Sequence, residues 1–148
     1  MLKKIIPLLV IILALSSCTL INKEPKRIHL NDKYYGSSEF ITVNSDDIPK
    51  KENFVLYTYN NYCNFSIPCD TIFKSFMESH NIAFVSIPFA KFKDTKYYQT
   101  VKYAPSVIII KKGKVVAYLD AESDEDLIKY QDVSAFETWI EKYIYFEK

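Results

Sequence analysis

The sequence predicts an α/β protein with a mixed central sheet of four to five strands flanked by helices. Apolar runs rich in β-branched and aromatic residues alternate with segments of helical periodicity. Two of these runs, 106–110 and 115–119, are separated by a short turn and so predict an antiparallel hairpin. The order strand, short helix, strand, helix, strand, helix, strand, strand, helix combines βαβ crossovers with that hairpin, which indicates a mixed sheet.

Strands are expected where β-branched and aromatic residues concentrate. They lie at 40–43, 54–59, 82–87, 106–110 and 115–119. The second run is almost continuously apolar or aromatic, as expected of a strand that is covered on both faces. Pro105 precedes the fourth run, where a proline is tolerated because it stands at the start of the strand.

The helix with the clearest limits is expected from Cys69 to His80. Its apolar residues recur on one face, namely Ile72, Phe73, Phe76 and Met77. Pro68 suits the first turn, where the missing N–H costs nothing. Asn81 is the expected C-terminal stop.

A C-terminal helix is expected to begin at a capping box, Ser134–Glu137. Its apolar stripe consists of Phe136, Trp139, Ile140, Tyr143 and Ile144, and is expected to pack on the sheet. Shorter helical turns are expected at 44–47 and within 90–103. The acidic segment 120–132 is expected to be a solvated loop or helix face.

The N-terminus has the pattern of a secretory signal peptide over residues 1–17. Lys3 and Lys4 precede an eleven-residue apolar run, Ile5–Leu15, which only Pro7 interrupts. An uncleaved transmembrane helix over Ile5–Ile21 is the alternative, but its seventeen residues are at the lower limit for spanning a bilayer.

The sequence Leu-Ser-Ser-Cys at residues 15–18 resembles the lipobox of bacterial lipoproteins. The resemblance implies cleavage before Cys18 and lipidation (palmitate) of that cysteine, which would anchor the chain to the extracytoplasmic face of the cell membrane. Stable anchoring takes two acyl signals or more. Residues 18–38 are then expected to form a polar tether, and residues 39–148 a single domain.

Composition excludes several classes of function. The chain has only two glycines, so it contains no Gly-rich phosphate loop. Its 19 basic residues, less Lys3 and Lys4, leave 17 against 18 acidic ones, a net charge of −1 for the mature chain. A surface this close to neutral does not predict nucleic-acid binding.

Cys63 and Cys69 remain as a pair once Cys18 is lipidated, in a compartment where disulfides persist. Five residues separate them, and the pair could be a redox centre, a structural disulfide or part of a metal site. A metal site would need further ligands, and His29 and His80 are the only histidines. Neither a metal nor a cofactor is therefore expected.

The element order resembles the thioredoxin fold over roughly residues 40–146. The run 54–59 leads through Tyr62 to Cys63, and a Pro-Cys opens the next helix, where thioredoxins have Trp-Cys-x-Pro-Cys. The segment Val-Lys-Tyr-Ala-Pro at 101–105 is similar to the family segment whose proline is cis and faces the cysteines. Gly113 in the hairpin turn and the final amphipathic helix also match the family.

The resemblance implies a thiol–disulfide oxidoreductase that acts on thiols or disulfides of exported proteins and could use a redox partner in the membrane. Cys63 would attack and Cys69 would resolve the mixed disulfide, although this spacing allows the roles to be exchanged. Ala104, Pro105 and Tyr62 would contact the substrate, with the backbone of Ala104 pairing with the bound peptide.

Three positions depart from the family pattern. The insertion at 64–67 lengthens the spacing between the cysteines, Tyr62 stands where the usual Trp is, and the family's buried acid falls on Tyr57. These departures keep a second interpretation open. In it, the chain is a non-catalytic lipoprotein of the same fold that has a structural disulfide and serves as a binding module of the envelope.

Overall fold

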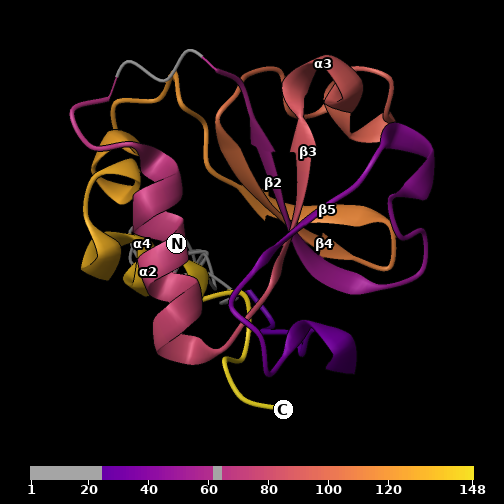
Figure 1. The fold of residues 1–148 in the computed structure, drawn as a ribbon, viewed down its shortest axis with the longest axis horizontal. Helices are drawn as coiled ribbons and strands as arrows, with labels where there is room; N and C mark the ends of the chain where they lie inside the picture. Colours follow the sequence, from indigo (N-terminus) through magenta and orange to yellow (C-terminus); the bar gives the residue numbers. More distant parts are fainter. Residues whose placement is uncertain (1–24, 62–64) are drawn as a thin grey trace, which may run out of the picture.

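A five-stranded mixed sheet forms the centre of the protein (Figure 1). The structure is a computed structural model that describes residues 25–61 and 65–148. In the order β1-β3-β2-β4-β5, the strands are β1 (Phe40–Thr42), β3 (Phe84–Pro88), β2 (Asn53–Tyr59), β4 (Ser106–Lys111) and β5 (Lys114–Tyr118). The first three run parallel, whereas β4 and β5 run antiparallel to their neighbours. The predicted fold class is therefore confirmed.

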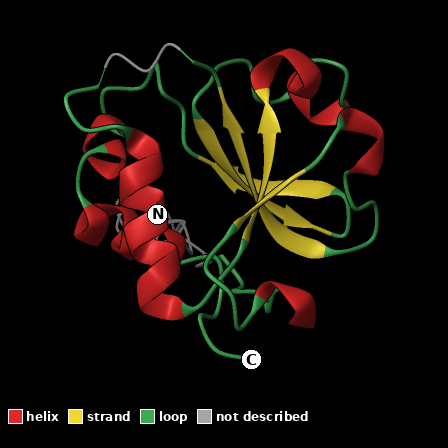
Figure 2. Cartoon of the chain, in the orientation of Figure 1, coloured by secondary structure: helices red, strands yellow, loops and turns green. Residues whose placement is uncertain are grey.

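The helices cover the sheet unequally. The α-helices are α2 (Cys69–His80), α3 (Phe89–Phe92) and α4 (Val133–Ile140), and single 3-10 turns are η2 (Asp32–Tyr34), η3 (Ser45–Asp47), η4 (Lys96–Gln99) and η5 (Leu127–Tyr130). Figure 2 shows α2 and α4 side by side, while α3 lies apart from them at the end of β3. The crossover from β2 to its parallel neighbour β3 needs a long connection, and α2 supplies it.

The central strand β2 is buried, as its apolar sequence predicts. Residues 54–58 are all buried, because β3 and β4 flank the strand and other elements cover both its faces. In the sequence, the first cysteine of the predicted pair comes four residues after the end of β2.

Aromatic rings hold α2 and α4 together. The ring of Phe136 in α4 lies 4.8 Å from Phe73 and 5.1 Å from Phe76 of α2, measured between centroids. Phe76 also contacts Phe84 of β3 at 6.0 Å. Removing one such buried ring typically costs about 3–5 kcal/mol. This layer therefore determines where α2 lies on the sheet.

Helix α2 has the predicted limits. Asn81 adopts the left-handed conformation (φ 50°) and its N–H donates to the carbonyl of Met77, as expected of a residue that ends a helix. Pro68 is the N-terminal cap and not a residue of the first turn. Its missing N–H still costs nothing at this position.

The C-terminal helix differs from the prediction at both ends. The Asp132 carboxylate accepts the N–H of Ala135 at 2.7 Å, so the helix begins at Val133 and the predicted capping box at Ser134 is wrong. Asp132 takes this role because its side chain lies one turn before the N–H that it caps. The helix ends at Ile140, yet Ile144 is buried because it forms an isolated parallel bridge with Ile28.

The folded domain also includes part of the expected tether. Ile28, Leu30 and Tyr34 are buried. The N–H of Ile28 donates to the carbonyl of Tyr143 at 2.8 Å, and the Tyr34 hydroxyl donates to the Glu52 carboxylate at 2.6 Å. Packing thus begins about ten residues before the expected boundary at residue 39. The polar part of the expected tether is the run before residue 28, and the buried residues follow it.

The signal peptide, Cys18, Tyr62 and Cys63 lie outside the described residues. Within the described part of the chain, no helix has both the length and the apolar character needed to cross a bilayer.

The two glycines differ in the space that a Cβ atom would have at each position, and this difference can be tested. Gly113 (φ +76°) lies in the hairpin turn, and a Cβ there would come within 2.6 Å of the Lys50 carbonyl oxygen. Gly36 (φ +87°) has nothing within 4 Å of the same virtual atom. We expect Gly113→Ala to lower the free energy of unfolding by about 2 kcal/mol or more, from backbone strain and the clash together.

Gly36→Ala is the matched control, because it adds the same methyl group with backbone strain alone, and about 1 kcal/mol or less is expected. Urea denaturation of both variants measures the difference. Equal losses would contradict the close approach of Lys50 to the hairpin.

Candidate functional site

Cys69 is the first residue of α2, and its side chain is buried at the point where the helix meets the sheet. Only 2% of the residue is exposed. At the helix start, the N–H of Thr71 donates to the carbonyl of Pro68 at 3.0 Å and to the carboxylate of Asp70 at 3.0 Å. A thiol at this position lies near the positive end of the helix dipole, although the Asp70 charge opposes that effect.

The hydroxyl of Tyr57 lies beside the sulfur of Cys69. Tyr57 Oη and Cys69 Sγ are 3.7 Å apart, within the range of a hydrogen bond to sulfur, and either atom could donate. Tyr57 belongs to β2 and is 6% exposed. The position that the thioredoxin resemblance assigns to a buried acid thus has a phenol in contact with the second cysteine of the pair.

The peptide bond between Ala104 and Pro105 is cis, as the resemblance implies. In the antiparallel register of β2 and β4, Thr58 is opposite Ser106, so the residues that follow β2 run beside those that precede β4. The amide Nδ2 of Asn60 donates to the Ala104 carbonyl at 3.3 Å. The segment before the cysteines is therefore tied to the residue before the cis proline.

Tyr130 connects the cis proline to the helical layer. It is fully buried, although it lies in the acidic segment that was expected to be solvated, and its hydroxyl donates to the Pro105 carbonyl at 2.9 Å. Its ring stacks on Phe65 at 5.4 Å and meets Phe73 edge-on at 5.9 Å. Burial raises the pKa of Tyr130 well above its ordinary value, and nearby acidic groups add to this, so the hydroxyl keeps its proton and remains a donor.

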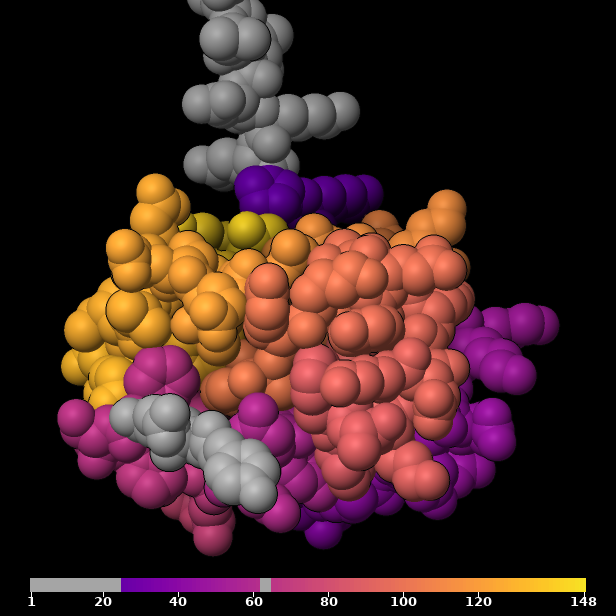
Figure 3. All heavy atoms as spheres, turned by 90° about the horizontal axis from the view of Figure 1, so that it is seen from above, coloured from indigo at the N-terminus to yellow at the C-terminus, as the bar shows by residue number. Residues whose placement is uncertain are grey.

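The next residue, Gln131, holds the segment that leads into α2. Its side-chain amide donates to the Ile67 carbonyl at 2.9 Å, and its oxygen accepts the Ile67 N–H at 3.1 Å. In the view from above, the segment that follows residue 64 lies next to the acidic segment 120–131 (Figure 3). These two hydrogen bonds hold the backbone of Ile67, two residues before Cys69, against Gln131.

A pocket of about 360 Å³ lies next to Cys69. Its walls combine the rings of three aromatic residues with hydroxyl and amide groups, and Asp70 is its one carboxylate among the described residues. Its lining consists of Phe40, Thr42, Tyr57, Tyr59, Asn60, Asn61, Cys69, Asp70 and Ser86. The pocket could take an uncharged part of a ligand close to the sulfur.

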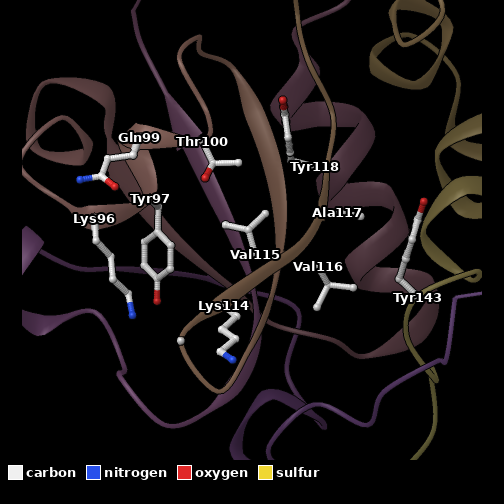
Figure 4. Close-up of a pocket in the computed structure, with 11 residues that line it drawn as sticks. Lys96, Tyr97, Gln99, Thr100, Lys114, Val115, Val116, Ala117, Tyr118 and Tyr143 are labelled. Carbon is white, nitrogen blue, oxygen red and sulfur yellow. The ribbon is translucent and has the colours of Figure 1, made fainter.

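A larger and more open hollow, of about 710 Å³, lies over β5 (Figure 4). Lys96 and Tyr97 face it from η4, and Lys114 and Val115 face it from β5. It shares no lining residue with the pocket at Cys69 and contains no thiol among its lining residues. Of the two, only the smaller pocket has a thiol among its described lining residues, that of Cys69.

Each histidine lies against a side chain of the folded domain. His80 Nε2 lies 3.2 Å from Glu137 Oε1, and the His29 ring stacks on Tyr145 at 4.4 Å. Among residues 25–61 and 65–148, no three His, Cys, Asp or Glu side chains gather in a way that could hold a metal ion.

Asn60 lines the pocket next to Cys69 and donates to the Ala104 carbonyl, and Tyr130 donates to the Pro105 carbonyl. The structure thus brings Cys69, Ala104 and Pro105 into one region. Tyr62 and Cys63, predicted to contact the substrate and to attack it, lie outside the described residues. Sequence reasoning missed Tyr130, Gln131 and Asn60. A single tyrosine in an acidic segment has no periodicity that marks it as buried, so only the fold reveals its role.

Comparison with known proteins supports the fold. No model of a known protein family matches the chain, and no curated protein matches it. The crystal structure of thioredoxin from Schistosoma mansoni is similar over 74% of this chain and all of that chain, with 25% identity and a TM-score of 0.50. The thioredoxin NaTrxh from Nicotiana alata aligns with 17% identity and a TM-score of 0.48 over 72% of this chain and 93% of that chain.

The likeness to the Schistosoma mansoni protein, together with the strand order and the cis proline, defines the class: this is a protein with a thioredoxin-like fold.

The contact of Gln131 with the segment before α2 can be tested by hydrogen exchange. Gln131→Ala removes the acceptor of the Ile67 N–H, so we expect that amide to exchange at least about tenfold faster, for a loss of about 1.4 kcal/mol. Gln99→Ala is the control, because Gln99 is exposed and its side chain makes no hydrogen bond to any described residue. Unchanged exchange at Ile67 in the first variant would show that Gln131 does not hold the segment.

Proposed function

We propose that this chain is a membrane-anchored, extracytoplasmic thiol–disulfide oxidoreductase that acts on exported proteins through Cys63 and Cys69. The observation that carries the proposal is the placement of Cys69. It opens α2 beside Tyr57, and the cis bond before Pro105 lies in the same region of the thioredoxin-like fold. A helix start that bears a cysteine is a site at which thiol reactivity is raised.

The proposed reaction is an exchange between a substrate disulfide and the cysteine pair. The thiolate of Cys63 attacks one substrate sulfur, a mixed disulfide forms, and the other substrate sulfur leaves as a thiolate that takes a proton from solvent. The thiolate of Cys69 then attacks Cys63, the bond between Cys63 and the substrate breaks, and the second substrate thiolate leaves. The substrate disulfide is reduced by two electrons and the pair becomes a disulfide. The same steps in reverse oxidise a substrate dithiol.

The burial of Cys69 supports its role as the resolving cysteine. At 2% exposure its sulfur is poorly placed to meet a protein substrate directly, but it can attack a neighbour within the same chain. Ala104 and Pro105 would pair with the backbone of the substrate, and Tyr62 would pack against it. Asn60 would be displaced from the Ala104 carbonyl, or share it, when the substrate binds.

A second candidate function has its own support. Cys69 is almost completely buried, and a phenol replaces the acid that would assist proton transfer. Both observations also fit a permanent disulfide in a non-catalytic lipoprotein that binds a partner in the envelope.

Redox titration of the full chain in detergent micelles separates the two functions. For an oxidoreductase we expect the two thiols to form a reversible redox couple in glutathione buffers, which thiol trapping and mass spectrometry measure. We also expect the protein to turn over oxidised glutathione that bears a fluorophore. Cys63→Ser should lower turnover at least about a hundredfold, whereas Cys69→Ser should accumulate the mixed disulfide on Cys63. Accumulation on Cys69 in the Cys63→Ser variant instead would exchange the two roles.

A potential below about −300 mV without turnover would favour the structural disulfide and refute the catalytic proposal. Ser66→Ala is the matched control, because it changes an exposed residue between the two cysteines without altering the thiols.

The anchoring part of the proposal rests on Cys18 and the segment before it. Lipidation adds about 0.8 kcal/mol of membrane affinity for each buried CH₂ group. We therefore expect Cys18→Ala to abolish incorporation of labelled palmitate, so that no processed, lipid-anchored chain is formed. Thr19→Ala should leave both unchanged. Labelled palmitate that persists in Cys18→Ala, found by fractionation and autoradiography, would rule out this anchor.

A further inference from the structure

The hydroxyl of Tyr57 is the part of this side chain that packing does not explain. Its ring contacts Phe40 at 5.3 Å, Tyr59 at 5.7 Å and Phe73 at 5.2 Å, and a phenylalanine would keep all three contacts. A hydroxyl that is buried without a hydrogen bond costs free energy. The contact with the sulfur of Cys69, at 3.7 Å, compensates for that cost.

Ordinary acidities decide the direction of this hydrogen bond when Cys69 ionises. A thiol ordinarily loses its proton near pH 8.5 and a phenol near pH 10, so a thiolate can lie beside a phenol that is still protonated. The phenol then donates and the sulfur accepts. A carboxyl group at the same position could donate only while it keeps its proton, and once ionised its charge would oppose the thiolate.

The surroundings of the two groups preserve this arrangement. In the sheet, Tyr57 is the register partner of Ser86, and the Ser86 and Thr42 hydroxyls lie 3.0 Å apart on the neighbouring strands. These three hydroxyls line the pocket next to Cys69, and Asp70 is the one carboxylate in its described lining. Asp70 is exposed, so its charge opposes the thiolate less than a buried carboxylate would.

We propose that Tyr57 is a positioning residue for thiol–disulfide exchange, whose hydroxyl donates a hydrogen bond to the thiolate of Cys69 and orients it for the resolving attack. The inference rests on the proposed function and deepens it, because it identifies what replaces a buried acid at this site. The exchange itself is unchanged: Cys69 forms the new bond to Cys63 and the substrate sulfur leaves. Tyr57 loses no proton in the reaction.

Tyr57→Phe tests the proposal because it removes a single oxygen and keeps the ring contacts. The rate of iodoacetamide alkylation of Cys69 in the reduced full chain is measured between pH 5 and pH 10, with the alkylated peptides resolved by mass spectrometry. Loss of a hydrogen bond to a charged sulfur should raise the pKa of Cys69 by about one unit, and so slow alkylation about tenfold below that pKa.

Tyr59→Phe is the matched control. It removes a hydroxyl from the same pocket, and that hydroxyl makes no hydrogen bond to any described residue. Its alkylation profile should coincide with that of the wild type. Near-UV circular dichroism verifies that both variants keep the native packing.

The outcomes separate this inference from the proposed function. A wild type without turnover, together with a shifted profile in Tyr57→Phe, would refute the oxidoreductase but retain the hydrogen bond to Cys69. Normal turnover in the wild type and an unshifted profile in Tyr57→Phe would overturn the role of Tyr57 alone. A loss of stability without a change in the profile would also overturn it, since it would leave Tyr57 a packing residue.

Discussion

Aromatic packing between α2 and α4 determines where the sulfur of Cys69 lies. Phe73 and Phe76 of α2 enclose Phe136 of α4, and the three rings are fully buried. Because the interior is close-packed, the helix cannot slide along the sheet without opening a void. The start of α2 is therefore held at the end of β2, and Cys69 is presented to Tyr57. Every chemical property of the site depends on that placement.

Two tyrosine hydroxyls make polar contacts around the sulfur and the cis proline. The Tyr57 hydroxyl contacts the sulfur itself, and the Tyr130 hydroxyl satisfies the carbonyl of Pro105. Buried polar groups persist only when they are paired, so both hydroxyls tie the site to the surrounding core. The site therefore has a neutral hydroxyl, that of Tyr57, at the position where the thioredoxin resemblance places a buried acid. The pocket beside Cys69 has the same character, since hydroxyl and amide groups dominate its polar lining.

Strong local patterns were sufficient to predict most of the framework. The apolar run of β2 and the one-faced periodicity of α2 predicted both elements, because the burial of each depends on its own residue spacing. The cis bond before Pro105 followed from the family resemblance of residues 101–105. The start of α4 was predicted wrongly, since Asp132 and Ser134 are both good caps and only the folded backbone selects between them. Tyr130 was missed because its burial depends on Phe65 and on the carbonyl of Pro105, which are distant in sequence.

The sequence by itself determined the class of fold, the limits of α2 and the position of one cysteine at a helix start. These features depend on hydrophobic periodicity and on proline and asparagine at element ends, which act over a few residues. Only the tertiary structure decided that Tyr57 touches Cys69, that Asn60 and Tyr130 meet the cis proline segment, and that Ile28 belongs to the core. Each of these contacts joins residues from separate elements, and no local pattern encodes the distance between them.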